Sequence, residues 1–160
     1  MVVLQLWIKA ELENVTDLQP ATDDFEYFFK VKCTSCNEVH PKQVSVNRTE
    51  EYELASGKAK ANFVWRCGMC KREHSASFNP AEKITPYNAE NAQFGPLLKI
   101  ECRGLEFIDF DPSGIWKVTG VGKGTKFNEV DLNEGEWTDY DEKAALPVGV
   151  SEVESKWTRA

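Results

Sequence analysis

Four of the five cysteines in this chain of 160 residues stand in two pairs with the same spacing. CTSCNEVH begins at Cys33 and CGMCKREH begins at Cys67, and each reads Cys, two residues, Cys, three residues, His. Two cysteines separated by two residues on a tight turn can direct both sulfurs at one point, and two such turns complete a tetrahedron. Soft thiolates suit zinc, whose filled d shell imposes no competing geometry. The spacing therefore predicts one zinc ion per chain, held by Cys33, Cys36, Cys67 and Cys70.

The two histidines, His40 and His74, are further candidate ligands. Each lies four residues after the second cysteine of its pair, on what we interpret as an outgoing strand. A strand rises about 3.3 Å per residue, which places each imidazole about 13 Å along the chain from that cysteine. We therefore favour the all-cysteine site and interpret both histidines as surface strand residues. A mixed site with one histidine and a redox-active C-x-x-C pair remain the alternatives, although redox pairs are usually single and lie at helix N-termini.

The cysteine pairs must be positioned by hairpins. FFKVKC and NFVWRC precede the pairs, and NEVHPKQV and KREHSASF follow them, with the composition of strands. Each pair is then the tip of a hairpin, a zinc knuckle. We expect Asn37, at the exit of the first turn, and Gly68, within the second, to adopt positive φ, because both residue types tolerate it.

Hydrophobic residues recur with a period of two over most of the chain, which is typical of strands. Three in-phase sets stand out: Leu4, Leu6, Ile8, Ala10 and Leu12; Phe25, Tyr27, Phe29, Val31 and Cys33; and Leu98, Ile100 and Cys102. Many short strands between turn residues predict an all-β sandwich or barrel. We expect a single domain over residues 1–160, built as a sandwich of two irregular, mostly antiparallel sheets with two zinc-knuckle hairpins. An irregular segment, 79–96, is expected to pack on the sheets through Tyr87 and Phe94, with one helical turn at 88–94.

Charge divides the chain into two parts. The knuckle region, about 28–78, is basic: Phe28 to Ala76 holds nine Lys/Arg and five Glu. The C-terminal part, about 97–160, is acidic: Gly104 to Ala160 holds six Lys/Arg and twelve Asp/Glu. The cations near the cysteines could offset the charge of the thiolates: Lys30, Lys32, Arg66, Lys71 and Arg72. Because the net charge is -7, nucleic acid is disfavoured as a partner.

The segment WTDYDEK, Trp137 to Lys143, allows two interpretations. It is either a docking strip for a basic partner or a loop whose Trp and Tyr cover the core, and the second is favoured. We also hypothesise that the acidic part is the partner-facing surface, whereas the basic residues surround the thiolates. No phosphate-binding Gly-rich loop, Ser-His-Asp order or zinc-protease motif is present, so catalysis has few candidates beyond the carboxylates of Asp109, Asp111 and Asp131.

Composition places the protein in a reducing compartment. No apolar run approaches the roughly 20 residues that span a bilayer, and Lys9, Glu11 and Glu13 interrupt the apolar N-terminus, unlike a signal peptide. An odd number of cysteines argues against a secreted disulfide framework. We expect a protein of the cytoplasm, with the nucleus as a second location, and no contact with membranes.

Several stretches together resemble the eukaryotic CXXC-motif-containing zinc-binding proteins, an uncharacterised family. They are LENVTDLQP, the two C-x-x-C units, ITPYNAENAQF, ECRGLEFIDFDP and WTDYDEKAALPVGVSEV, and they extend from about residue 4 to about residue 155. The resemblance implies a single all-β domain whose zinc is bound by Cys33, Cys36, Cys67 and Cys70. It implies no enzyme chemistry.

The expected function is binding and not catalysis. We predict a monomeric zinc-binding protein in which the zinc is structural and the chain binds a protein partner that the sequence does not identify. The alternative is a metal-handling or thiol-redox protein that uses the four-cysteine site.

Overall fold

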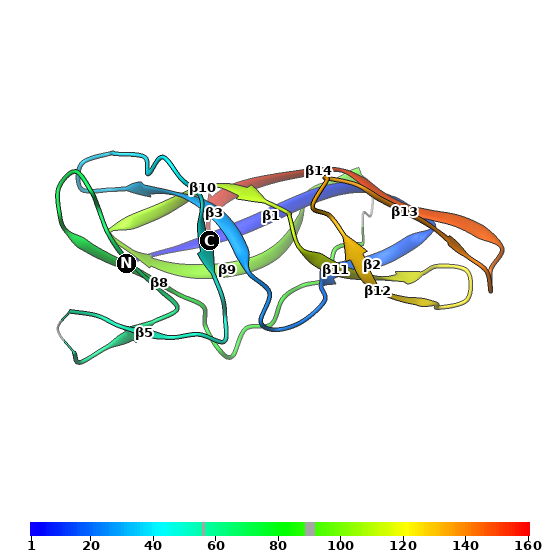
Figure 1. Ribbon diagram of the computed structural model, residues 1–160, viewed down its shortest axis with the longest axis horizontal. Coiled ribbons are helices and arrows are strands. Elements are labelled where there is room, and N and C mark those ends of the chain that lie inside the picture. The colour runs from blue at the N-terminus through cyan, green and yellow to red at the C-terminus, as the bar shows by residue number, and fades with distance from the viewer. Residues whose placement is uncertain (56, 89–91) are drawn as a thin grey trace.

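The computed structural model describes residues 1–55, 57–88 and 92–160, and its elements are strands (Figure 1). The strands within these ranges are β1 (Val2–Glu13), β2 (Val15–Pro20), β3 (Tyr27–Cys33), β4 (Val44–Val46), β5 (Tyr52–Glu53), β6 (Lys60–Ala61), β7 (Phe63–Arg66), β8 (Glu73–Ser77), β9 (Gly95–Arg103), β10 (Leu105–Asp111), β11 (Ile115–Gly120), β12 (Lys126–Asp131), β13 (Trp137–Asp141) and β14 (Leu146–Arg159). The all-β fold class is confirmed. Within those ranges, no helix is long and apolar enough to span a lipid bilayer.

The strands form four sheets in the described part of the chain, where the sequence predicted two. The largest has the order β13-β14-β1-β9-β8-β7, two have three strands in the orders β10-β3-β4 and β12-β11-β2, and β5 pairs with β6. Every strand pairing is antiparallel. Asn14 after β1 and Gly104 after β9 have φ of 56° and 79°. At each of these residues the chain passes from the large sheet into a smaller one. Single left-handed residues therefore account in part for the division of the strands among several sheets.

The alternation predicted for the long strands is present. In β1, Leu4, Leu6, Ile8 and Ala10 are buried and Leu12 is partly buried. In β9, Leu98, Ile100 and Cys102 are no more than 4% exposed, whereas Lys99 and Arg103 on the other face are exposed. Both predictions are confirmed. Burial raises the pKa of the Cys102 thiol to about 12, with a smaller contribution from Glu106, so this cysteine is a core residue.

Aromatic residues join β3 to β10 and to the large sheet. Phe29 is fully buried, and its ring centroid lies 4.7 Å from that of Phe107 on β10 and 5.0 Å from that of Trp157 on β14. The predicted buried face from Phe25 to Cys33 is confirmed, since all five alternate residues are buried. Because aromatic packing anchors β3, it also fixes the position of Cys33, the buried last residue of this strand, where the first knuckle begins.

The irregular segment between β8 and β9 packs as predicted through Tyr87. This side chain is 3% exposed, and its backbone exchanges two hydrogen bonds with Leu18, of 2.8 and 2.9 Å. Phe94 is partly buried. The helical turn predicted at 88–94 includes residues 89–91, which lie outside the described residues.

The prediction for WTDYDEK was half wrong. The segment is largely strand β13, and Trp137 packs on Phe127 with 5.5 Å between ring centroids, but Tyr140 is 52% exposed and does not cover the core. Asp141 is instead the buried residue, at 2% exposure. Its carboxylate accepts hydrogen bonds from the Thr125 hydroxyl at 2.9 Å and from the Ala144 amide at 3.3 Å. Because β13 pairs with β14, Asp141 lies on the inward face, where the Thr125 hydroxyl and the Ala144 amide satisfy the hydrogen-bonding capacity of its carboxylate.

Candidate metal centre

The first knuckle follows β3. The Cys33 amide donates to Glu38 O at 2.9 Å, and the Asn37 amide donates to Cys33 O at 2.9 Å. Asn37 has φ of 64°, as predicted. Lys32 and Val39 then form an isolated antiparallel bridge, so the chain leaves the turn alongside the strand by which it entered.

The second knuckle, between β7 and β8, repeats this hydrogen-bond pattern. The Cys67 amide donates to Arg72 O and the Lys71 amide donates to Cys67 O, both at 3.0 Å. The left-handed residue is Lys71, with φ of 63°, and Gly68 is not among the positive-φ residues. The prediction for Gly68 was therefore wrong. The fourth residue after the first cysteine closes each turn, and the hydrogen bonds impose its conformation whatever its type.

The two knuckles bring four sulfur atoms together. The Sγ atoms of Cys33, Cys36, Cys67 and Cys70 all lie within 4.8 Å of one another. The Cys33–Cys70 distance is 3.7 Å and the Cys36–Cys67 distance is 3.6 Å. A tetrahedron of sulfurs at the usual Zn–S length of about 2.3 Å has edges of about 3.8 Å. One cluster is thus positioned to hold a single metal ion, and the thiols are not joined as disulfides.

Backbone amides prepare the first cysteine of each knuckle for ionisation. Burial is the largest single influence on the pKa of Cys33 and raises it, but hydrogen bonds from the Cys36 and Ser35 amides and from the Cys70 and Cys36 side chains together outweigh burial, and the pKa is lowered. At Cys67 the Cys70 amide is the largest influence, and the pKa falls to about 7 despite burial. Metal ligands must be thiolates, so these amides favour the charged form that binds a cation.

His74 is buried beside the sulfurs, at 6% exposure, so its interpretation as a surface residue was wrong. Its Nε2 atom lies 3.2 Å from Cys33 Sγ. A thiolate only accepts hydrogen bonds, so Nε2 carries the proton when Cys33 is ionised. Burial, followed by the charge of Arg72, lowers the pKa of His74 and favours this neutral ring. In the sequence, the alternation of His74 with the apolar Ala76 and Phe78 was the signal that it faces inward.

Gly104 makes the space that the imidazole occupies. A Cβ at this position would lie 2.0 Å from His74 Nδ1 and 2.7 Å from its Cε1. The residue also has φ of 79°, which side chains disfavour. Sequence reasoning missed Gly104, because only the tertiary structure brings the β9–β10 turn against β8.

His40 has a different role. It is partly buried at the exit of the first knuckle, and its ring centroid lies 5.8 Å from that of Trp65. Trp65 also lies 5.9 Å from His74, so one indole separates the two histidines. Of the two histidines, both of which the structure describes, only His74 is hydrogen-bonded to a cysteine sulfur.

The neighbouring cations do not form one group. Lys32 pairs with Glu106 at 3.6 Å, and Arg66 donates to Lys71 O at 2.8 Å across the second knuckle. Arg72 is exposed and acts on His74. That the five cations together offset the charge of the thiolates stays a prediction.

Comparison with known proteins shows the family to which the chain is similar. The family model described as CXXC motif containing zinc binding protein, eukaryotic, matches residues 5–158. A CXXC motif containing zinc binding protein from Xenopus laevis is 43% identical over 160 residues, and one from Homo sapiens is 40% identical over 157; the alignments cover at least 98% of each chain. The crystal structure of C1orf123 superposes with a TM-score of 0.90 at 38% identity, over 99% of both chains.

A hypothetical protein from Plasmodium falciparum superposes with a TM-score of 0.85 at 26% identity, over 99% of this chain and 100% of that one. These relatives extend over the knuckles and over the sheets described above. The chain therefore belongs to the eukaryotic family of CXXC-motif-containing zinc-binding proteins, whose activity is uncharacterised.

Proposed function

We propose that Cys33, Cys36, Cys67 and Cys70 bind one zinc ion as four thiolates and that this ion fastens the two knuckles together. The convergence of their sulfur atoms within 4.8 Å carries the proposal. Four thiolates complete a tetrahedral site and leave no position for a substrate, which is typical of structural zinc. When bound, zinc supplies a crosslink between β3 and the β7–β8 hairpin.

X-ray absorption at the zinc edge tests the ligand set. We expect one zinc per chain with four sulfur neighbours at about 2.3 Å. His74 belongs to the surrounding shell, so His74→Phe should leave four sulfur neighbours in place. An imidazole signal in the wild type that disappears in this variant would overturn the all-thiolate site.

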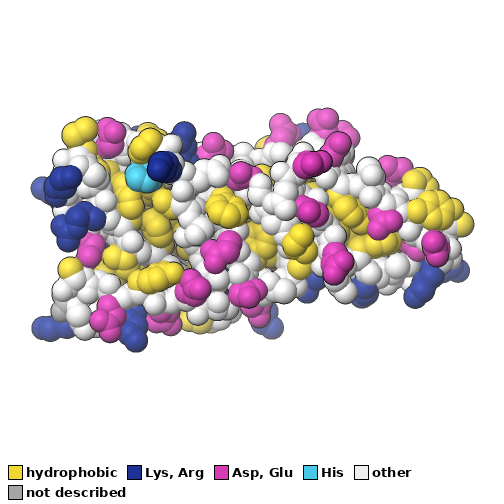
Figure 2. Space-filling view, viewed as in Figure 1, with side chains coloured by type: hydrophobic (Ala, Val, Ile, Leu, Met, Phe, Trp, Pro, Cys, Tyr) yellow, Lys and Arg dark blue, Asp and Glu magenta, His cyan; other side chains and the backbone are white. Residues whose placement is uncertain are grey.

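The function proposed for the fastened knuckles is protein binding. Val39 and Met69 belong to the knuckles and are 38% and 66% exposed. Met is common on surfaces that bind other proteins because its side chain adapts to them. Figure 2 shows Lys and Arg side chains gathered at the end of the long axis where Figure 1 places the knuckles, which suits an acidic partner. We place this function in the cytoplasm, where thiols stay reduced.

Partner capture from native cell extract, with proximity crosslinking, tests whether the partner binds the knuckles or the acidic C-terminal part. Val39→Asp with Met69→Asp alters the knuckles, and Asp139→Asn with Glu142→Gln alters exposed acids on and beside β13. We expect the first pair to reduce capture at unchanged zinc content and the second pair to leave it unchanged. Loss of capture in the second pair alone would move the partner to the acidic part. Equal capture by all variants would end the protein-binding proposal.

Metal transfer is the second candidate function. Cys33 and Cys67 are fully buried, but Cys36 and Cys70 are only partly buried, so an acceptor could reach one sulfur from each knuckle. A structural site should lose zinc slowly to a mild chelator at a rate independent of chelator concentration. A transfer site should lose it in a second-order reaction with the chelator. Rapid second-order loss would favour transfer over the structural role.

A further inference from the structure

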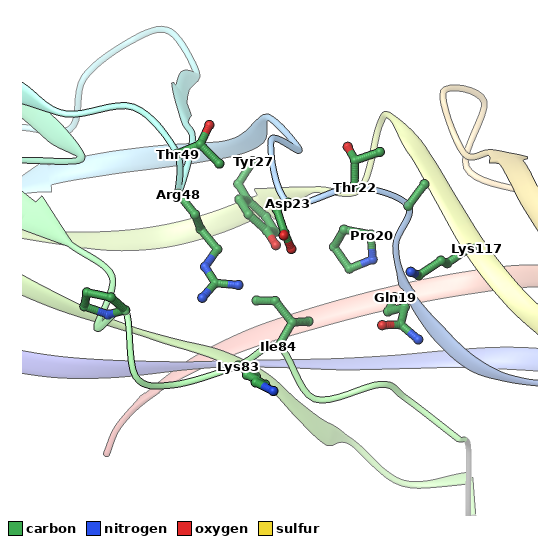
Figure 3. A pocket seen from close by; sticks show the side chains of 12 residues that line it. Gln19, Pro20, Thr22, Asp23, Tyr27, Arg48, Thr49, Lys83, Ile84 and Lys117 are labelled. Carbon is green, nitrogen blue, oxygen red and sulfur yellow. The ribbon is translucent and has the colours of Figure 1, made fainter.

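A pocket of about 660 Å³ lies between the ends of β2, β3 and β11 and the loops after β4 and β8 (Figure 3). None of its lining residues belongs to either knuckle. Its lining includes three cations, Arg48, Lys83 and Lys117, and a single acid, Asp23. A net charge of +2 is thus concentrated in one hollow of a protein whose overall charge is -7.

The pocket cations are not neutralised by neighbouring acids. Over the described ranges, the salt bridges are Lys9–Glu154 and Lys32–Glu106, and neither involves the pocket. Arg48 is held in place, since it donates to Glu82 O at 2.8 Å and its guanidinium lies 5.8 Å from the Phe78 ring centroid. The remaining donors of a fixed guanidinium fork suit the oxygens of an anion.

A buried tyrosine supplies a further donor. Tyr27 is 1% exposed, and its ring stacks on Phe29 with 5.9 Å between centroids. Its hydroxyl points into the pocket near Asp23 (Figure 3). In the part of the chain that the structure describes, this hydroxyl makes no hydrogen bond to protein, and it is open to the pocket, because every buried side-chain nitrogen or oxygen atom there has a hydrogen-bond partner. Burial raises the pKa of Tyr27, so the hydroxyl keeps its proton and can donate it.

The walls of the pocket are partly apolar. Pro20, Ala21 and Ile84 contribute to them, so an organic group attached to an anion would find apolar surface there. A phosphate monoester fits both features, because it carries close to two negative charges and three acceptor oxygens beside its organic group. A carboxylate offers one charge and two oxygens, which would leave donors of the pocket unused.

We propose that this pocket is a binding site for a small organic phosphate, in which Arg48, Lys83 and Lys117 neutralise the phosphate and the Tyr27 hydroxyl donates a hydrogen bond to it. The site is independent of the zinc centre and goes beyond the function proposed for the knuckles. Asp23 opposes the anion, so it weakens affinity and biases the pocket toward ligands that carry more than one negative charge.

Titration of the full-length, zinc-loaded protein with phenyl phosphate, followed by NMR at low salt, tests the proposal. We expect saturable shifts at Tyr27, Arg48 and Lys117 with a Kd of about 1 mM or tighter. Tyr27→Phe keeps the ring and should weaken binding about tenfold, and Arg48→Met should weaken it at least as much. Asp23→Asn should tighten binding by about threefold, because it removes the opposing charge.

Lys123→Met is the matched control, because Lys123 is an exposed cation outside the pocket. It should leave the affinity unchanged. Zinc content and the dispersion of the spectra show that each variant is folded. Absence of saturation, or equal weakening by Lys123→Met and Arg48→Met, would overturn the site. Benzoate binding as tight as that of phenyl phosphate would overturn the assignment to phosphates.

Discussion

The Nε2 atom of His74 lies 3.2 Å from the sulfur of Cys33, in a buried contact between β8 and the end of β3. This hydrogen bond joins the two knuckles without a metal. It comes from the second hairpin and acts on a cysteine of the first. A partner that orients a metal ligand in this way typically changes affinity for the metal by 10- to 100-fold.

His74→Phe should therefore release zinc more readily. The ring volume is kept but the donor is lost, and we expect zinc affinity to fall by about tenfold or more. Competition with a chromophoric chelator measures the change. His40→Phe is the control, because His40 contacts Trp65 and lies outside the hydrogen-bonded group. Equal zinc affinity in the wild type and His74→Phe would show that the contact does not support the site.

Gly104→Ala should destabilise the protein by displacing His74 from its contact with Cys33. The added Cβ would meet His74 Nδ1 at 2.0 Å, and φ is 79°. Gly124→Ala separates the effect of the positive φ from the effect of the steric clash, since Gly124 has φ of 68° but nothing within 4 Å of its Cβ position. We expect a loss of about 1 kcal/mol for Gly124→Ala and about 3 kcal/mol for Gly104→Ala.

Urea unfolding of the zinc-loaded proteins measures both losses. The Gly104 variant should also release zinc faster, because displacing the imidazole disturbs Cys33. Equal losses for the two glycines would mean that His74 moves aside without cost.

Lys71→Asn should stabilise the second knuckle. Lys71 has φ of 63°, and Asn37 already occupies the equivalent position of the first knuckle with φ of 64°. Asn tolerates this conformation better than Lys, so we expect a gain of about 0.5–1 kcal/mol in the free energy of unfolding. The reverse change, Asn37→Lys, should cost a similar amount. Thermal unfolding at fixed zinc concentration checks both, and a loss of stability in Lys71→Asn would contradict the strain argument.

Cys102 should stay unmodified in the folded, zinc-loaded protein. It is 1% exposed, and burial raises its pKa to about 12, so neither access nor ionisation favours attack at pH 8. A chromogenic disulfide reagent should find about four reactive thiols after chelation under native conditions, and Cys102→Ser should not change that number. Rapid labelling of Cys102 before chelation would contradict the burial of this face of β9.

Asp141→Asn and Asp139→Asn should differ in their effect on the free energy of unfolding, although both residues lie on β13. Asp141 is buried and accepts from Thr125 and Ala144, so weakening its acceptors should cost about 1–2 kcal/mol. Asp139 is exposed, and its replacement should stay within about 0.5 kcal/mol. Denaturant unfolding compares the pair. A large effect at Asp139 alone would mean that the inward face of β13 is wrongly assigned.

Local patterns in the sequence were sufficient to predict that the four cysteines cluster and that the long strands alternate. The C-x-x-C spacing and the period of two depend on geometry within a few residues, so Cys33, Cys36, Cys67 and Cys70 and the buried faces of β1, β3 and β9 could be predicted. The prediction that His74 lies on the surface was wrong for a related reason. Its distance was measured along its own strand from the cysteine of its own pair, whereas it contacts Cys33 of the other knuckle.

The tertiary structure alone decided which distant residues meet. His74, Cys33 and Gly104 come from three strands or turns that are far apart in the sequence, and Tyr27, Arg48, Lys83 and Lys117 come from four segments. The residue types marked His74 only as a candidate ligand and gave no sign that Gly104 or the pocket residues share a site, because antiparallel pairing and left-handed residues such as Gly104 direct the chain between sheets. Such contacts depend on the packing of whole sheets against one another, and no short-range period in the sequence records that packing.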